Sequence, residues 1–317
     1  MTARPVSSTV APHVALNEAA QRRPSVLRTL LVTLRPEQWT KNLLVFAGIM
    51  FGGRLLDIDA VSSAIGAFAI FCGLSSTVYI FNDLADRDAD KQHPLKGTRP
   101  IASGDLPVGI AAAAGLAIGG AALLGATLMR PALGLVSAAY LLLLLLYSAA
   151  LKHLVIIDVL VIAGGFVLRA VAGAVAVDVP ISHWLLVCTT LLALFLALSK
   201  RRHELTLLGD GAVGHRRILE EYSPYLLDQM IAVVTASTLV AYTLYTTDAE
   251  TASRLGTGRL GLTIPFVLYG IFRYLYLVHQ KRGGGSPSTM LVTDRPLLAC
   301  VALWGLSVAV LLYFPLG

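Results

Sequence analysis

Long uncharged apolar runs constrain the fold of this 317-residue chain more than any other feature of its sequence. A helix needs roughly 17 to 25 apolar residues to cross the hydrocarbon core of a bilayer. Runs such as Tyr140 to Tyr147 (YLLLLLLY) lack the alternation of a barrel strand, so helices are the expected spanning elements. The sequence therefore predicts an all-α, polytopic membrane protein with nine transmembrane helices, at 39–55, 61–81, 106–128, 132–150, 155–177, 182–199, 228–247, 260–278 and 296–314.

The region before the first predicted span divides into two parts. Glu18, Arg22 and Pro24 interrupt the stretch where a cleaved signal would need an apolar core, so residues 1–24 are expected to form a disordered cytosolic tail. Residues 25–317 are expected to form a single transmembrane catalytic domain. Val26 to Leu34 fits either a short helix at the headgroup level or an extension of the first span.

Lys and Arg are distributed unequally between the two sides of the nine-span topology. Nineteen fall on the side that holds the amino terminus, and four fall on the other side. Because cytosolic loops are the ones enriched in Lys and Arg, the amino terminus and the basic loops are predicted to be cytosolic and the carboxyl terminus to lie outside, in a plasma membrane. The net charge of +6 also suits anionic substrates.

An acidic run, NDLADRDAD, follows the second predicted span. If the helix continues through it, Asn82, Asp86 and Asp90 share one face, Asp83 is adjacent, and Asp88 points away. Crowded carboxylates repel one another unless a cation neutralises them, and oxygen ligands suit Mg²⁺. Asn82, Asp83, Asp86 and Asp90 are therefore predicted to bind Mg²⁺ and, through the metal, a diphosphate group. The alternative is a solvated acidic helix end.

Basic and polar residues accompany the acidic run on the predicted cytosolic side. His93, Lys96 and Arg99 follow it directly and are candidate ligands of phosphate oxygens. Tyr147 and Lys152 end the fourth span, where they can donate a hydrogen bond and a positive charge to a phosphate. The alternative for each of these residues is that it anchors the protein at the membrane surface and contacts no substrate.

Three more segments contribute candidate substrate contacts. Gln38, Lys41 and Asn42 share a helical face at the start of the first span and are expected to face a cavity. Asp158 and Arg169 are three helical turns apart in the fifth span, where they either line a pathway or pair with a neighbouring helix. The end of the sixth span adds Lys200, Arg201 and Glu204, of which Glu204 is a candidate second metal or ribose contact.

Asn82-Asp83-x-x-Asp86-x-x-x-Asp90, followed by Arg99-Pro100 and Gly104 in a chain of this length, resembles the motif of the UbiA superfamily of intramembrane prenyltransferases. The resemblance implies helices around a central cavity open toward the bilayer, with acidic motifs on two cytosolic loops that hold Mg²⁺ and a diphosphate. This chain departs from the usual pattern at the second motif, where a DxxxD-like cluster is replaced by KRRHE at 200–204.

With KRRHE at 200–204 and RPxQWxKN at 35–42, the sequence resembles one branch of this superfamily. Members of that branch transfer phosphoribose from 5-phosphoribosyl diphosphate to decaprenyl phosphate, for arabinan cell-wall precursors. On this reading, Asp83, Asp86 and Asp90 are expected to be the metal ligands at the catalytic centre. Lys41, Lys152 and Arg169 are expected to orient the phosphates. An aromatic prenyltransferase with a polyprenyl diphosphate donor and a transporter are the alternatives. The expected partners are the two substrates, the bilayer and further copies of the chain, as in a trimer, with no nucleic acid.

Overall fold

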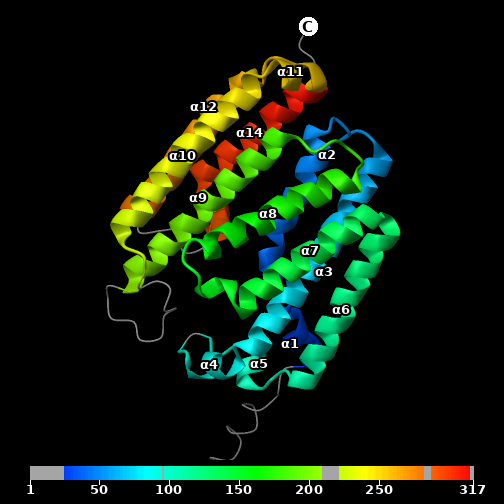
Figure 1. Ribbon diagram of the computed structural model, residues 1–317, viewed down its shortest axis with the longest axis vertical. Coiled ribbons are helices and arrows are strands. Elements are labelled where there is room, and N and C mark those ends of the chain that lie inside the picture. Colours follow the sequence, from blue (N-terminus) through cyan, green and yellow to red (C-terminus); the bar gives the residue numbers. More distant parts are fainter. Residues whose placement is uncertain (1–24, 95, 209–220, 282–286, 315–317) are drawn as a thin grey trace, which may run out of the picture.

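The computed structural model describes residues 25–94, 96–208, 221–281 and 287–314, and within these ranges it contains helices and no strand (Figure 1). Eight helices are long and apolar enough to cross a membrane. They are α3 (Ile58–Ala85), α6 (Val108–Met129), α7 (Pro131–Ala149), α8 (Ile157–Ala176), α9 (His183–Leu208), α10 (Pro224–Thr247), α12 (Ile264–Gln280, extended by η4, Leu260–Thr263) and α14 (Arg295–Tyr313). The predicted all-α, multi-pass architecture is confirmed. The predicted tail at 1–24 lies outside the described residues.

The first predicted span, 39–55, is not one of these eight helices. Its residues form a 3₁₀ helix, η1 (Pro36–Phe46), and a short α-helix, α2 (Ala47–Phe51). A Cβ on Gly173 of α8 would lie 1.8 Å from the backbone oxygen of Val45, so the backbones of η1 and α8 touch directly. Nine long transmembrane helices are thus not confirmed among the described residues: eight are found, and the first predicted span is a 3₁₀ helix followed by a short α-helix.

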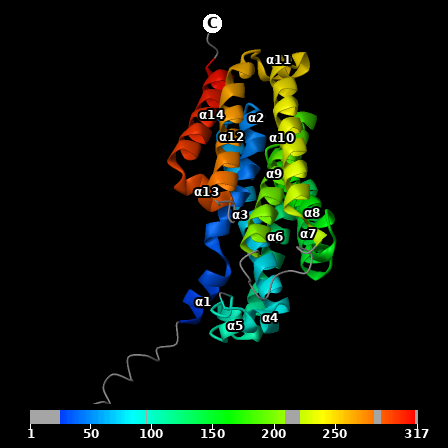
Figure 2. The same cartoon turned by 90° about the vertical axis from the view of Figure 1, so that its left-hand side faces the viewer.

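Successive segments alternate in direction, so their connections gather at two ends of the molecule (Figure 2). One end, here called the α4–α5 end, holds the described parts of the connections predicted to be cytosolic. The opposite α11 end holds the last described residue, Phe314. The short elements α1 (Val26–Thr33), α4 (Arg87–Gln92) and α5 (Pro100–Ser103) lie together at the α4–α5 end, and α11 (Ala249–Leu255) lies at the other end. The 3₁₀ turn η2 (Leu151–His153) follows α7, and α13 (Pro287–Thr293) packs beside α14 about midway along the molecule in Figure 2.

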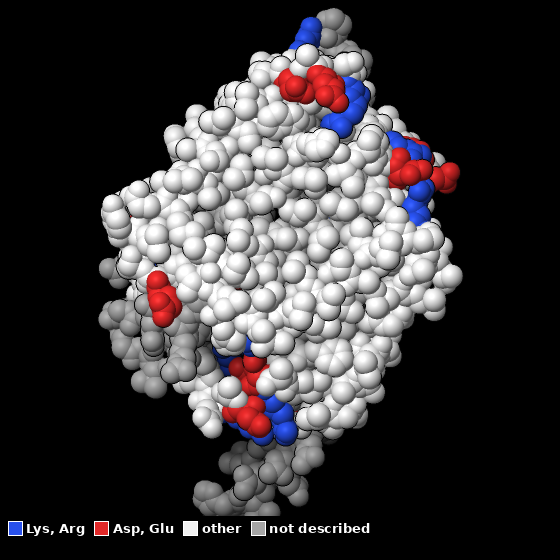
Figure 3. All heavy atoms as spheres, viewed as in Figure 1, with Lys and Arg blue, Asp and Glu red and all other residues white. Residues whose placement is uncertain are grey.

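The distribution of charge matches this two-ended arrangement. On the face drawn in Figure 3, most Lys, Arg, Asp and Glu side chains gather toward the two ends, and the band between them is almost uncharged. Leu, Ile, Val and Phe side chains remain exposed along the helices, as a lipid-facing surface requires. The outer surface is therefore that of a protein embedded in a bilayer.

The centre of the bundle is formed by α3 and α8. In each, 56% of the most apolar window is buried, against 22% in α6, α7, α12 and α14. Small residues let α6 approach α3 closely: a Cβ on Gly115 would lie 3.2 Å from Ile80, and one on Gly119 would lie 3.0 Å from Thr77. The two central helices carry the polar groups of the candidate site to the α4–α5 end.

Candidate functional site

The acidic run stays helical after α3 ends. Asp86 caps α3 and precedes α4. Its backbone N–H donates to the backbone oxygen of Asn82 at 2.9 Å. The backbone N–H of Asp90 donates to the backbone oxygen of Asp86 at 2.8 Å. The four-residue helical spacing that the sequence suggests is therefore kept from Asn82 to Asp90.

Asp83 and Asp90 share one cation. Nη1 of Arg99, which precedes α5, donates to Asp83 Oδ1 at 3.0 Å and to Asp90 Oδ2 at 2.6 Å. Nη2 of Arg35 donates to both oxygens of Asp83, at 2.7 and 3.0 Å. The side chains of the two aspartates are only 4% and 5% exposed. Because a buried carboxylate is costly unless it is paired, these arginines stabilise the charge that the fold brings inside.

Asn82 and Asp86 have different partners. Ser148 at the end of α7 donates its hydroxyl to Asn82 Oδ1, and Lys152 in η2 donates to Asp86 Oδ1, both at 3.0 Å. The four residues predicted to bind the metal therefore form two pairs. Asn82 and Asp86 bond to the α7–η2 segment, whereas Asp90 shares Arg99 with Asp83.

Asp88 lies outside both pairs, as the sequence suggests. Its side chain is 87% exposed and, among the residues that the structure describes, forms an ion pair only with Lys91 of the same helix, at 3.0 Å. The hydrogen bond from Lys91 lowers the pKa of the Asp88 carboxyl below its ordinary value. This exposed pair on α4 is a natural control for the less exposed pairs beside it.

The predicted metal ligands have suitable chemistry but are not gathered into a closed cage. Among the described residues, no three His, Cys, Asp or Glu side chains surround a common point. However, oxygens of Asp83 and Asp90 flank the single nitrogen Nη1 of Arg99, so this position between two buried carboxylates already holds a positive charge. Carboxylate oxygens are the donors that Mg²⁺ prefers, so the residues fit such an ion in place of the guanidinium group.

A second network of charges lies where α7, α8, α9 and α10 meet. Arg201 donates from Nε to Asp158 at 2.8 Å, from Nη1 to Glu204 at 2.5 Å and from Nη2 to the Tyr147 hydroxyl at 3.2 Å. The Tyr222 hydroxyl donates to the other Asp158 oxygen at 2.9 Å. Asp158 therefore forms an ion pair with Arg201 of the neighbouring helix α9, which was one of the two alternatives. The charge of Glu204 is balanced by the same arginine, one turn earlier in its own helix.

Arg169 takes part in a separate buried network. It donates to Asn42 Oδ1 at 2.7 Å, to the Gly165 backbone oxygen at 2.9 Å and to the Tyr140 hydroxyl at 2.6 Å. Asn42 has no exposed surface and donates in turn to Ser75 at 3.2 Å. The expectation that Asn42 faces a cavity is therefore wrong, because it links η1 to α3 and α8.

The 3₁₀ geometry of η1 explains this difference. With three residues per turn, Gln38 and Lys41 share a face, whereas Asn42 is rotated away from them. Gln38 and Lys41 are both half-buried. Lys41 makes no hydrogen bond or ion pair with any described residue. It lies within electrostatic reach of three other cations, Lys200, Arg169 and Arg35, and of the carboxylate of Glu37.

The remaining candidates lie on the segment between α4 and α5. His93 and Lys96 are half-buried there, and the backbone oxygen of Lys96 accepts the N–H of Arg99 at 3.0 Å. Sequence reasoning assigned no role in the site to four of the residues found in it. A polar side chain inside or beside an apolar run was the signal available for each, namely Arg35, Tyr140, Ser148 and Tyr222.

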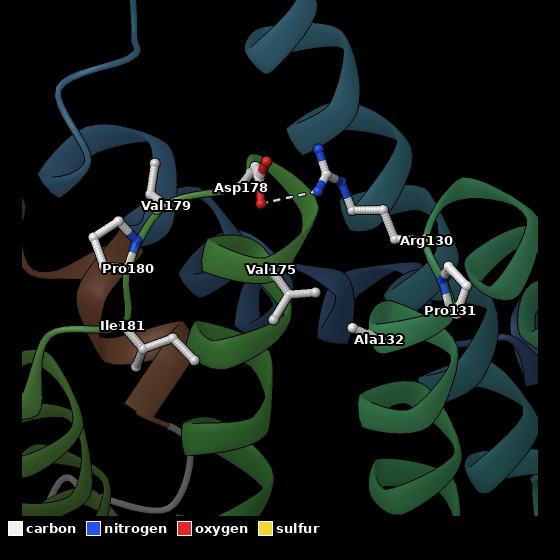
Figure 4. A pocket seen from close by; sticks show the side chains of 8 residues that line it. All are labelled: Arg130, Pro131, Ala132, Val175, Asp178, Val179, Pro180 and Ile181. Atoms are coloured by element: carbon white, nitrogen blue, oxygen red, sulfur yellow. Dashed lines mark ion pairs between the residues drawn. The ribbon is translucent and has the colours of Figure 1, made fainter.

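A pocket of about 450 Å³ lies at the other end of the molecule (Figure 4). Arg130 and Asp178, which face each other across it at 3.0 Å, lie between α6 and α7 and just after α8. The candidate site lies beside the opposite ends of α7 and α8, about 30 Å away for helices of this length. This pocket is therefore not part of the site, and the predicted central cavity stays a prediction.

Comparison with known proteins agrees with this geometry. A family model described as the UbiA prenyltransferase family matches residues 43–291. A decaprenyl-phosphate phosphoribosyltransferase of Corynebacterium glutamicum is 31% identical over 95% of this chain and 93% of its own. One from Mycobacterium tuberculosis is 34% identical over 87% of this chain and 93% of its own.

Among solved structures, a UbiA homolog from Archaeoglobus fulgidus bound to GPP and Mg²⁺ aligns with a TM-score of 0.68. It is 19% identical in sequence and covers 89% of this chain and 99% of its own, so the likeness concerns the fold. The family model covers most of the sequence, and the two curated relatives match nearly end to end. The chain therefore belongs to the UbiA prenyltransferase family.

Proposed function

We propose that the protein transfers the 5-phosphoribosyl group of 5-phosphoribosyl diphosphate to decaprenyl phosphate, releasing diphosphate, with Mg²⁺ as its cofactor. The observation that carries this proposal is the excess of cations at the α4–α5 end. Asp83, Asp86, Asp90, Asp158 and Glu204 are each already paired with Arg or Lys. Lys41 lies within electrostatic reach of three further cations, Lys200, Arg169 and Arg35, and of one carboxylate, Glu37. Two phosphate-bearing substrates supply the anions that such a surplus favours.

The donor diphosphate is assigned to the acidic run and its cations. Asp83, Asp86 and Asp90 would hold Mg²⁺, with Asn82 beside them, and the bound metal would stabilise negative charge on the departing diphosphate. Arg99, which contacts two of these carboxylates when no metal is bound, can contribute a second share of this stabilisation through its guanidinium group. The chain's own part is to place these groups around the leaving oxygen.

The acceptor is assigned to the side of Lys41. A phosphate oxygen of decaprenyl phosphate forms the new bond to ribose C1 as the bond from C1 to the diphosphate oxygen breaks. The acceptor phosphate is already anionic, so no strong general base is required. Its polyprenyl tail would lie in the bilayer along the exposed apolar helices, and the α4–α5 end would face the cytosol, because most Lys and Arg lie on that side.

An aromatic prenyltransferase is the second candidate, since a solved structure of the same fold is bound to GPP. That reaction requires a prenyl cation to be shielded in an apolar cavity. The charged networks of Arg201 and Arg169 argue against it, because both guanidinium groups are buried where α8 meets its neighbours. The predicted homo-trimer stays a prediction.

A purified preparation offered each donor and acceptor pair with Mg²⁺ tests the proposal. Labelled ribose should appear in the lipid fraction only when 5-phosphoribosyl diphosphate and decaprenyl phosphate are both present. A prenylated aromatic product without any ribosyl lipid would select the second candidate. Omitting Mg²⁺, or adding a chelator, should abolish the ribosyl lipid.

A further inference from the structure

Arg99 occupies the position between Asp83 and Asp90 that a metal ion would take. We propose that Arg99 is a placeholder cation, and that the divalent metal consequently binds together with the diphosphate and only weakly without it. This inference rests on the proposed function and deepens it, because it specifies the form in which the donor is bound.

The first reason is the position of the Arg99 guanidinium group between two carboxylates. A single nitrogen, Nη1, donates to one oxygen of each aspartate, at 3.0 and 2.6 Å. Two carboxylates held this close and this deeply buried repel each other unless a cation lies between them. A metal ion that binds both carboxylates must therefore displace this guanidinium nitrogen.

Exposure distinguishes this arginine from the one in the neighbouring network. The Arg99 side chain is 26% exposed, and no partner other than the two aspartates is found for it among the described residues. The Arg201 side chain is 2% exposed and has three partners, from α7, α8 and α9 itself. Arg99 can therefore turn outward, whereas Arg201 is held in place by its partners.

The second reason concerns the charge of Arg99 after a metal ion has displaced it. When Arg99 leaves the aspartates it loses both anionic partners, and a bare metal ion offers it no replacement. A metal ion that arrives with a diphosphate does, because the phosphate oxygens accept the displaced guanidinium group. The same exchange applies to Lys152, which is 12% exposed and bound to Asp86. Metal and diphosphate should thus raise each other's affinity, by about 10-fold or more, within the range usual for coupled sites.

The first experiment measures binding of Mn²⁺ to the full-length protein by electron paramagnetic resonance, without any phosphate. Wild type is expected to bind Mn²⁺ weakly, and Arg99→Gln is expected to bind it about 10-fold more tightly, because the placeholder is gone. Lys91→Gln is the matched control. It removes one positive charge from α4 at the exposed Asp88 pair and should leave Mn²⁺ affinity near that of wild type. Arg99→Lys keeps the charge and should remain close to wild type.

The second experiment repeats the titration with pyrophosphate, and subtracts the complex formed in solution by calibration without protein. Pyrophosphate should strengthen Mn²⁺ binding to wild type and should have much less effect on Arg99→Gln. Size-exclusion profiles and thermal unfolding confirm that the variants are folded.

Two results would overturn the inference. One is an Arg99→Gln variant that binds free Mn²⁺ no more tightly than wild type or Lys91→Gln. The other is equal coupling to pyrophosphate in wild type and Arg99→Gln. Failure of wild type to bind Mn²⁺ even with pyrophosphate would overturn the metal site and this inference together. The proposed transfer reaction is judged separately, by labelled ribose in lipid.

Discussion

Asp158 on α8 and Arg201 on α9 form a buried ion pair, with 2.8 Å between Oδ2 and Nε and side-chain exposures of 0% and 2%. Although Asp158 and Arg201 are 43 positions apart in the sequence, their ion pair joins the two helices directly. Because Arg201 also holds Glu204 and Tyr147, it fixes the ends of α7, α8 and α9 relative to one another.

Replacing Arg201 with Met should destabilise the protein strongly. The substitution leaves the Asp158 charge buried without its cation, which should lower the free energy of unfolding by about 3 to 5 kcal/mol. Thermal unfolding in detergent micelles measures the loss. The double variant Arg201→Met with Asp158→Asn should recover much of the stability, because neither charge is then left alone. Equal unfolding temperatures for Arg201→Met and wild type would contradict the assigned role.

Gly173→Ala should separate the first segment from α8. The added Cβ would lie 1.8 Å from the Val45 oxygen, which is backbone and cannot rotate away. We expect a loss of at least about 3 kcal/mol, the upper end of ordinary overpacking, or no folded protein. Gly120→Ala is the control, because nothing lies within 4 Å of a Cβ there. Yield and thermal unfolding of the two variants give the comparison.

Asp86→Asn should impair transfer without unfolding the protein. The change removes the charge that pairs with Lys152 and one predicted metal ligand, so we expect turnover to fall about 100-fold. Asp88→Asn removes an exposed carboxylate two residues away and should retain nearly full activity. Steady-state rates of ribosyl-lipid formation across a Mg²⁺ titration provide the measurement. Equal rates for the two variants would argue against the assigned metal site.

Asp294→Ala should cost about 1 kcal/mol of stability at neutral pH through loss of a helix cap. Asp294 accepts the backbone N–H of Leu297 at 2.9 Å and a hydrogen bond from Arg273 at 2.8 Å. The bonds from Arg273 lower the pKa of the Asp294 carboxyl, so its ionised form is favoured by folding. That contribution is complete above the ordinary pKa of Asp and is lost as the pH falls through the lowered value. The difference in unfolding temperature between Asp294→Ala and wild type should therefore shrink at low pH.

The sequence predicts the bundle well because lipid imposes a simple rule. A run of apolar residues long enough to cross the bilayer must satisfy its own backbone hydrogen bonds, so it becomes a helix. The runs at 106–128 and 132–150 accordingly match α6 and α7 within two residues at each end. The prediction at 182–199 ends too early, because α9 continues through the charged residues to Leu208.

Partners across the bundle follow a different logic. Asp158 and Arg169 share a face of α8, yet each bonds to another element, because helix rotation and depth decide which side chains meet. α3 and α9 have apolar residues all round, so their sequences do not indicate which side faces which neighbour. The sequence therefore predicts a site at Asn82 to Asp90 but does not show which of its residues pair with Arg99 and which with Lys152.

The 3₁₀ winding of η1 has a consequence for distance. A 3₁₀ helix rises about 2.0 Å per residue, so the eleven residues of η1 extend about 22 Å. The five residues of α2 add about 7.5 Å. Together they reach about 30 Å, the thickness of a hydrocarbon core, whereas an ordinary α-helix of the same residues would stop near 24 Å. Arg35 and Gly52 can therefore stand a full bilayer apart although only sixteen residues connect them.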